Sequence, residues 1–334
     1  MSKTRITIPV FVPHAGCRHL CVFCNQWNVS GSSVQSGIDD LNSTVDRYLS
    51  AVPPTVTRVE IAFFGGSFTG IDTARQTMLL EAAQGYVQKG LVHAIRLSTR
   101  PDYIDNEKLD LLKQFSVETV ELGVQSFDDD VLGASGRGHT AADVYRAIEL
   151  LKQYGFRTGI QLMPGLPCDT REKSLYSADE AVRLKPDDSR IYPCVVLAGT
   201  GLEAMYRRGE FAPLGLEEAV DICAEIYKRF IDNGIKVIRI GLHPLENTGS
   251  VIDGPYHTAM GFMVKSRYRR NILDSLLSGL PAGPGRKIRM SIPLKFSEEY
   301  IGLRKCNMEY IKSRYSLDTL EYELQECSSP RIIP

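Results

Sequence analysis

The sequence contains no apolar run that approaches the roughly 20 residues a membrane-spanning helix needs. It also shows no charged-then-apolar leader before its first strand-like stretch, so we expect a cytoplasmic protein with no membrane partner. Its 39 Lys and Arg residues nearly balance its 40 Asp and Glu residues. The protein as a whole therefore has no positive electrostatic field that would recruit polyanions. Any basic patch must therefore be local.

Stretches typical of strands and of helices alternate along the first part of the chain. The strand-like segments are residues 6–13, 59–66, 94–102, 119–126, 157–167, 189–197 and 235–242. This alternation predicts βαβ units and a parallel sheet, and at least six units in series favour a barrel or partial barrel. Unusual residues follow successive strands, at the end of such a barrel where active groups gather. We predict an α/β core spanning residues 1–245.

The alternation fades beyond about residue 246. Residues 246–255 are typical of a linker, and residues 278–287 of a Gly/Pro loop. Between Lys265 and Arg314 there are twelve Lys or Arg residues and four Asp or Glu residues. We predict that residues 246–334 form a smaller accessory region, packed on the barrel or covering it, with a local excess of positive charge.

Three of the eight cysteines, Cys17, Cys21 and Cys24, lie within eight positions of one loop. In a reducing compartment, clustered cysteines more often bind metal or act in catalysis than form disulfides. The C-x3-C-x2-C spacing suits a 4Fe–4S cluster with one iron left open. Two alternatives stay open: a zinc site, for which His14 or His19 could supply the fourth ligand, and three unrelated cysteines.

The remaining five cysteines share no ligand spacing, and we expect them to be small buried hydrophobes. They are Cys168, Cys194, Cys223, Cys306 and Cys327. A second cluster is not predicted.

The stretch "CRHLCVFC", with an aromatic residue one place before its third cysteine, resembles the radical S-adenosylmethionine (SAM) superfamily. The resemblance covers roughly residues 5–245 and also rests on "FFGGSFTG", "STRPD", "ELGVQSFDD", "GRGHT" and "MPGLP", which occur in the expected order. It implies a partial (β/α)6 TIM-like barrel. The motifs look similar to the core of the Elongator catalytic subunit, in the form of its short bacterial-type relatives without an acetyltransferase domain.

The resemblance implies that Cys17, Cys21 and Cys24 hold a 4Fe–4S cluster and that SAM chelates its open iron. An electron donor such as flavodoxin or ferredoxin would reduce the cluster. SAM would then be cleaved to methionine and a 5′-deoxyadenosyl radical, which abstracts hydrogen from an unidentified substrate. The cofactor carries the hard chemistry, and the protein supplies placement and exclusion of solvent.

The resemblance also assigns contacts with SAM to the cysteine loop and to the loop after the second strand. Phe23 is expected near the adenine. Gly65 and Gly66 are expected at the methionine amino group, because a backbone without Cβ atoms can approach a ligand closely. Ser67 stands where many members carry an acid. A tight strand-to-helix turn is the other explanation of the two glycines.

Later strand ends carry further candidates for cofactor binding. Ser98 and Arg100 end the third strand, and the planar fork of an arginine suits the methionine carboxylate. Arg100 could equally be a solvated loop residue or pair with Asp102. Gln125, with Ser126, could hydrogen-bond the ribose. Gln161 lies in an otherwise apolar strand and must find a polar partner, either ligand or backbone.

Four more positions are weaker candidates, for proton transfer or for contact with substrate. His139 in "GRGHT" could transfer protons, or it could be a loop or capping residue. Residues near the expected substrate mouth are Tyr192, Arg239 and His243.

The function predicted is a radical SAM enzyme, and the basic C-terminal region suggests RNA, with tRNA as a specific candidate, as its substrate. Two alternatives remain. One is chemistry like that of oxygen-independent coproporphyrinogen oxidase, whose members share the barrel. The other is a non-enzymatic iron–sulfur or metal carrier.

Overall fold

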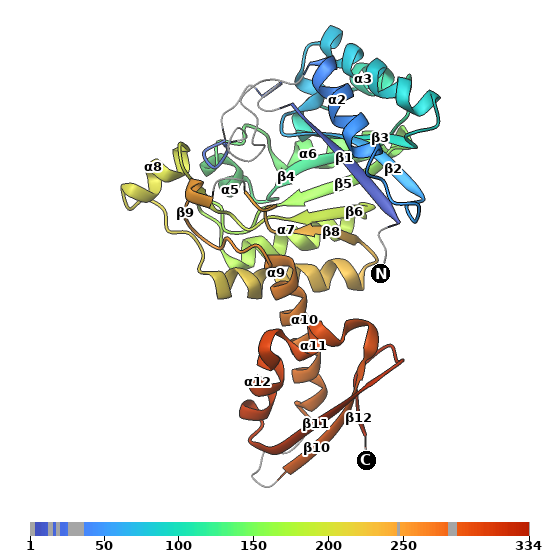
Figure 1. Ribbon diagram of the computed structural model, residues 1–334. Coiled ribbons are helices and arrows are strands. Elements are labelled where there is room, and N and C mark those ends of the chain that lie inside the picture. The colour runs from blue at the N-terminus through green and yellow to red at the C-terminus, as the bar shows by residue number, and fades with distance from the viewer. Residues whose placement is uncertain are drawn as a thin grey trace.

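The computed structural model describes residues 4–12, 16–17, 21–25, 37–245, 248–279 and 286–333. Its largest feature is a curled sheet of seven parallel strands in the order β1-β2-β3-β4-β5-β6-β8, surrounded by helices (Figure 1). The predicted α/β class and the partial TIM-like barrel are thereby confirmed.

The strands and helices follow the predicted order closely. The strands are β1 Arg5–Phe11, β2 Arg58–Phe64, β3 Ala94–Thr99, β4 Val117–Gln125, β5 Arg157–Leu162, β6 Asp188–Ile191, β7 Val196–Leu197, β8 Lys236–Ile240, β9 Val251–Asp253, β10 Arg286–Pro293, β11 Leu317–Gln325 and β12 Arg331–Ile333. The helices are α2 Ile38–Leu49, α3 Thr73–Gln88, α4 Asn106–Lys113, α5 Asp129–Ala134, α6 Ala141–Gln153, α7 Arg171–Leu184, α8 Gly201–Arg207, α9 Leu216–Asp232, α10 Met260–Leu277, α11 Ser297–Ile301 and α12 Cys306–Arg314.

Burial on both faces explains why the barrel strands are apolar. Ile61, Ala62 and Phe63 succeed one another in β2, and all three are fully buried. Strands of a parallel sheet covered by helices read as nearly continuous apolar runs for this reason. Because every neighbouring pair is parallel, the loops that follow the strands meet at one rim of the barrel.

Two predictions about the later part of the chain are wrong. Residues 189–197 do not form one strand: β6 ends at Ile191, and β7 leaves the barrel sheet to pair antiparallel with β9. Pro193 lies between them, and a proline cannot donate a ladder hydrogen bond. The predicted linker contains β9, so this part of it is ordered by strand pairing; residues 246–247 lie outside the described ranges.

The C-terminal region forms a small α/β unit with its own hydrophobic core. Helix α10 joins it to the barrel, because Met260 and Val264 pack in the barrel core whereas Leu273 and Leu277 pack in the second core. Strand β10 pairs parallel with β11 and antiparallel with β12, and the unit extends beyond α9 (Figure 1). The boundary predicted between residues 245 and 246 stays a prediction. Most of the predicted Gly/Pro loop, residues 280–285, lies outside the described ranges.

Ion pairs neutralise much of the positive charge of this unit. Arg267 pairs with acids on α9, Arg269 with Glu299, and Arg314 with Asp274. Within the described ranges, the exposed cations of the unit that make no ion pair are Lys287, Lys295, Arg304, Lys305, Lys312 and Arg331.

None of the described helices combines the length and the apolar character needed to cross a bilayer.

Candidate active site

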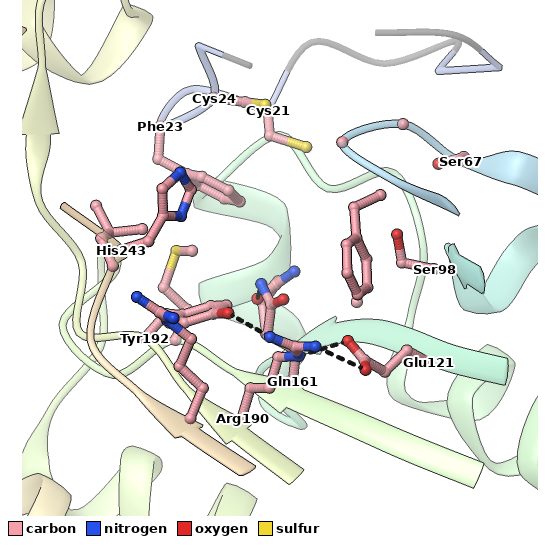
Figure 2. A pocket seen from close by; sticks show the side chains of 18 of the residues that line it. Cys21, Phe23, Cys24, Ser67, Ser98, Glu121, Gln161, Arg190, Tyr192 and His243 are labelled. Carbon is pink, nitrogen blue, oxygen red and sulfur yellow. Dashed lines mark hydrogen bonds and ion pairs between the residues drawn. The ribbon is translucent and has the colours of Figure 1, made fainter. Parts of the chain in front are cut away.

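A cavity opens at the rim of the barrel. Its volume of about 660 Å³ lies within the range of ~300–1,000 Å³ typical of ligand sites. Eleven of the twelve residues predicted to bind the cluster or the cofactor line it, the exception being Ser126. They are Cys17, Cys21, Phe23, Cys24, Gly65, Gly66, Ser67, Ser98, Arg100, Gln125 and Gln161. The fold therefore brings together segments that end or follow β1, β2, β3 and β4 with a side chain of β5 (Figure 2).

Backbone hydrogen bonds hold the second half of the cysteine loop against two helices. The amide of Val22 donates to the carbonyl of Ser135, just after α5 (3.1 Å), and the amide of Leu202 in α8 donates to the carbonyl of Val22 (2.6 Å). The side-chain amide of Asn25 donates to the carbonyl of Ala198 (2.9 Å). These contacts fix the segment that carries Cys21 and Cys24 without using either thiol.

Two glycines let the first half of the cysteine loop contact the loop after β2. Gly16 has φ +73°, and a Cβ atom on it would lie 2.3 Å from the carbonyl oxygen of Ser67. A Cβ atom on Gly70 would lie 2.4 Å from the carbonyl oxygen of Gly16. Only glycine fits such an approach of backbone to backbone. The contact sets Cys17 beside Ser67, with 3.4 Å between Sγ and Oγ.

The loop after β2 is itself shaped for close approach. Gly65 has φ +94°, a conformation that side chains disfavour. The hydroxyls of Thr69 and Thr99 lie 2.6 Å apart, and both residues are buried, so this hydrogen bond ties the loop to the end of β3. The glycine pair is thus part of a strand-to-helix turn that also lines the cavity.

All eight cysteines are free thiols. Among the described residues, no group of three His, Cys, Asp or Glu side chains converges as a single ion would require. A 4Fe–4S cube binds its thiolates at separate irons, so three thiols need not converge on one point to hold it. His14 and His19, the alternative zinc ligands, lie outside the described ranges.

The prediction for the other five cysteines is partly wrong. Cys194 and Cys223 are buried, as predicted, and burial raises the pKa of the Cys194 thiol to about 12. Cys168 and Cys306 are exposed instead. Cys168 has φ +62° and lies in the turn after β5, which keeps it at the surface.

Arg100 keeps one donor unused at the cavity wall. Its Nε and one terminal nitrogen donate to the two carboxylate oxygens of Asp102 at 2.9 and 3.0 Å, and its guanidinium lies over the ring of Tyr103. Burial acts to lower the pKa of Arg100, but the hydrogen bonds and charge of Asp102 outweigh it and raise that pKa. The other terminal nitrogen is buried with no partner. Arg100 can therefore pair with Asp102 and still have a nitrogen available to bind a methionine carboxylate.

Arg137, which the sequence reasoning missed, lines the cavity beside the cysteines. One terminal nitrogen of its guanidinium donates to Sγ of Cys21 (3.1 Å), and the other donates to the carbonyl of Gly123. Its Nε is buried and unpartnered. Arg137 lies in the motif "GRGHT", which the sequence analysis singled out. The motif was interpreted through His139, because histidine is the more usual residue for proton transfer.

Side-chain hydrogen bonds order the polar residues of β4 and β5. The Gln161 amide donates to Oε1 of Gln125 (3.1 Å), and Gln125 has φ +72°, a strained conformation of the kind that collects at functional sites. Ser126 does not line this cavity; its hydroxyl accepts from the amide of Asp128 and contacts Ser177. Ser98 lines the cavity and donates to the carbonyl of Phe63.

His139 is held as a neutral imidazole. Burial, followed by the nearby positive charge of Arg137, lowers the pKa of His139 to about 3. Its Nε2 lies 3.2 Å from the carbonyl of Val124, and its side chain does not line the cavity. With so low a pKa the ring does not gain a second proton near neutral pH, and it lies outside the cavity, so a structural role is favoured.

A buried charge network forms the floor of the barrel beneath the cavity. Arg96 and Arg190 both donate to the carboxylate of Glu121, and Arg96 also reaches Asp188 (3.5 Å). Burial raises the pKa of Asp188. Arg190 in turn donates to the hydroxyl of Tyr192 (3.0 Å), as drawn in Figure 2. Single-sequence reasoning could not pair these residues, because their partners lie on different strands.

Residues 11–177 match the radical SAM superfamily, and residues 186–270 match the radical SAM C-terminal domain. The chain belongs to the radical SAM superfamily of enzymes. It is 32% identical over 194 residues to the tRNA uridine(34) acetyltransferase of Methanocaldococcus jannaschii, covering 52% of this chain and 36% of that protein. It is 27% identical over 192 residues to human Elongator complex protein 3, covering 52% and 35%.

A solved structure supports the fold. Elp3 of Methanocaldococcus infernus, with its N-terminal residues 1–46 deleted, superposes with a TM-score of 0.66 and 22% identity over 81% of this chain and 64% of that one. The predicted membership of the radical SAM superfamily is thus confirmed, and about half of the chain is similar in sequence to Elongator-type proteins. The sequence match spans little more than a third of the length of the archaeal acetyltransferase and of the human Elongator protein.

Proposed function

We propose that this radical SAM enzyme holds a 4Fe–4S cluster through Cys17, Cys21 and Cys24, binds SAM in the rim cavity and acts on a nucleoside of RNA. The observation that carries the proposal is the shared cavity: eleven residues chosen from five separate stretches of sequence line one space of about 660 Å³. Parallel strand ends generally meet at one rim, so the specific support is the chemistry gathered there: three free thiols and a buried, unpartnered guanidinium nitrogen of Arg100.

The residues present fit these cofactors. Three free thiols supply the ligand type that iron–sulfur clusters use. When bound, the reduced cluster supplies the one-electron cleavage of SAM to methionine and a 5′-deoxyadenosyl radical. The unpartnered, buried nitrogen of Arg100 is the donor available for the methionine carboxylate.

The other lining residues have roles consistent with their positions. The backbone at Gly65 and Gly66 is open to the amino group of methionine, beside Ser67. Phe23 offers an apolar surface to the adenine. Ser98, Gln125 and Gln161 carry the polar groups that would contact the rest of the cofactor. Arg137 would hold the thiolate of Cys21 in place and offset the negative charge of the thiolates.

RNA as substrate is supported by two observations. The curated relatives are named for tRNA uridine and for the Elongator complex. The C-terminal unit also carries exposed cations that make no ion pair in the described ranges, among them Lys295, Arg304 and Lys305. Lysines and arginines that are free of acids are the groups that contact phosphates. The identity of the electron donor, flavodoxin or ferredoxin, stays a prediction.

The test is the formation of 5′-deoxyadenosine from SAM. The protein is purified without oxygen, reconstituted with iron and sulfide, and given SAM and a strong reductant. We expect product from the wild type and none from Cys21→Ala, because a cluster deprived of one ligand is not held. Cys168→Ala removes an exposed thiol away from the cavity and should match the wild type.

Equal turnover in Cys21→Ala and the wild type would contradict the proposal. Iron retained without any 5′-deoxyadenosine would favour the carrier alternative, and consumption of coproporphyrinogen would favour the oxidase alternative. For the substrate, we expect tRNA to bind with an affinity that falls steeply with salt and that weakens in K295E/R304E/K305E. Binding that is insensitive to both changes would remove RNA from the proposal.

A further inference from the structure

The cavity has a second, cationic wall that the proposed cofactor contacts leave unused. Strand β6 and the residue after it contribute Arg190 and Tyr192, and β8 contributes Arg239. In Figure 2, Tyr192 and Arg190 lie across the cavity from Cys21 and Cys24. This wall is therefore where a substrate, rather than the cluster, would be placed.

All three nitrogens of the Arg190 guanidinium donate hydrogen bonds, so this side chain is a fixed frame: it is held in one position. Its Nε and one terminal nitrogen donate to Glu121 at 2.6 and 3.2 Å, and the other terminal nitrogen donates to Tyr192. The guanidinium lies 5.0 Å from the ring centroid of Phe64, and the side chain is only 15% exposed. Burial acts to lower the pKa of Arg190, but the charge and hydrogen bonds of Glu121 and Tyr192 outweigh it. Arg190 is thus held charged and in place.

Arg239 is the register partner of Arg190 on the neighbouring strand, and its surroundings are different. Its Nε donates to the carbonyl of Gly241 (3.2 Å), and within the described ranges it forms no ion pair with any acid. The two terminal nitrogens of its guanidinium have no partner in that part of the chain. Because Arg190 already engages Glu121, none of the described residues of this wall offers a carboxylate to neutralise Arg239.

The cavity as a whole has an excess of positive charge. Four arginines line it, and Glu121 is the only acid among its described lining residues. Arg100 is paired with Asp102, and Arg137 contacts the cysteine loop. Among the arginines that the structure describes in this lining, Arg239 is therefore the one whose charge is used neither by a neighbouring acid nor by the proposed cofactors.

We infer that Arg239 is the anchor for an anionic group of the substrate, a nucleotide phosphate, with the nucleoside lying between it and the cofactor end of the cavity. This inference rests on the proposed function for its substrate class. A guanidinium with two free terminal nitrogens can bind a phosphate through two parallel hydrogen bonds. Enzymes that act on a base within RNA or DNA take the nucleotide out of its stack into such a pocket. Tyr192, held by Arg190, is a positioning residue for the sugar or base.

The experiment compares the binding of radiolabelled uridine 5′-monophosphate and uridine to the full chain by equilibrium dialysis, with SAM present. In the wild type we expect the monophosphate to bind ~10-fold to 100-fold more tightly, as for a charge-assisted, bidentate contact. Arg239→Met should remove this preference, and Arg239→Lys should keep part of it, because the charge remains but the fork is lost. Inorganic phosphate should compete, whereas acetate should not.

Arg289→Met is the matched control, because it removes an exposed arginine of the C-terminal unit that pairs with Glu323. It should keep the full preference for the monophosphate. Equal affinities in the wild type would overturn the inference, and so would a preference that survives Arg239→Met. Acetate competing as well as phosphate would also overturn the phosphate assignment, in favour of a carboxylate.

The result separates this inference from the proposed function. Wild-type protein that forms 5′-deoxyadenosine but does not distinguish the two ligands would refute the phosphate site alone. A preference that depends on Arg239, without any 5′-deoxyadenosine, would refute the radical chemistry and leave the phosphate site standing. Unfolding midpoints of the Arg239 variants, compared with the wild type, show that each is folded before its affinity is interpreted.

Discussion

Arg96→Met is expected to lower the free energy of unfolding by ~3–5 kcal/mol, the cost of leaving buried charges without their partner. Arg96 is 4% exposed, and it contacts Glu60, Glu121 and Asp188, each of which is also buried. Methionine has a similar volume but offers no hydrogen bond or charge. Urea unfolding of the apo protein, followed by circular dichroism, measures the effect.

Arg289→Met is again the matched control, because the pair between Arg289 and Glu323 is largely exposed. Such a pair contributes only ~0–1 kcal/mol, so the control should stay close to the wild type. If the two variants lost the same small amount of stability, Arg96 would not be an essential member of a buried network. The role of Arg190 as a fixed frame would then lose its support.

Gly16→Ala is expected to reduce the iron bound after reconstitution by ~10-fold or more, as losing a supporting contact does at metal sites. The added Cβ atom would lie 2.3 Å from the carbonyl oxygen of Ser67, and φ +73° is strained for alanine in any surroundings. The cysteine loop would have to move away from the loop after β2, and Cys17 would leave its place beside Ser67. Iron and sulfide analysis measures the effect.

Gly85→Ala is the control for this substitution. Gly85 lies in α3, no atom lies within 4 Å of the position its Cβ would take, and alanine is the better helix former there. That variant should bind as much iron as the wild type. Iron content in Gly16→Ala equal to that of Gly85→Ala would show that the glycine contact does not position the cysteine loop.

The sequence predicted the barrel well because the signals for its elements are local. Apolar strands such as Val59–Phe63 and the alternation of strands and helices each depend on nearby residues. The candidate site residues came from the resemblance to the radical SAM superfamily, and the fold explains why they lie together. Parallel connections bring every strand end to one rim, so that order along the chain predicts proximity in space.

What the sequence could not reveal depends on contacts between distant segments. The carboxylate of Glu121 is shared by arginines 25 and 69 positions away, and no local pattern pairs them. The split of the sixth strand depends on β9, some 55 residues later. The pairing of β10 with β11 in the C-terminal unit was not predicted, because two short helices with weak periodicity separate the two strands.

The most direct test of an open iron in this protein is electron paramagnetic resonance of the reduced, reconstituted protein with and without SAM. We expect the signal of a 4Fe–4S cluster that changes when SAM is added, because under the proposed function one iron would have no protein ligand. The change should be absent in Cys21→Ala and present in Cys168→Ala. A signal that SAM leaves unchanged, or a protein that holds zinc and no cluster, would contradict the central claim.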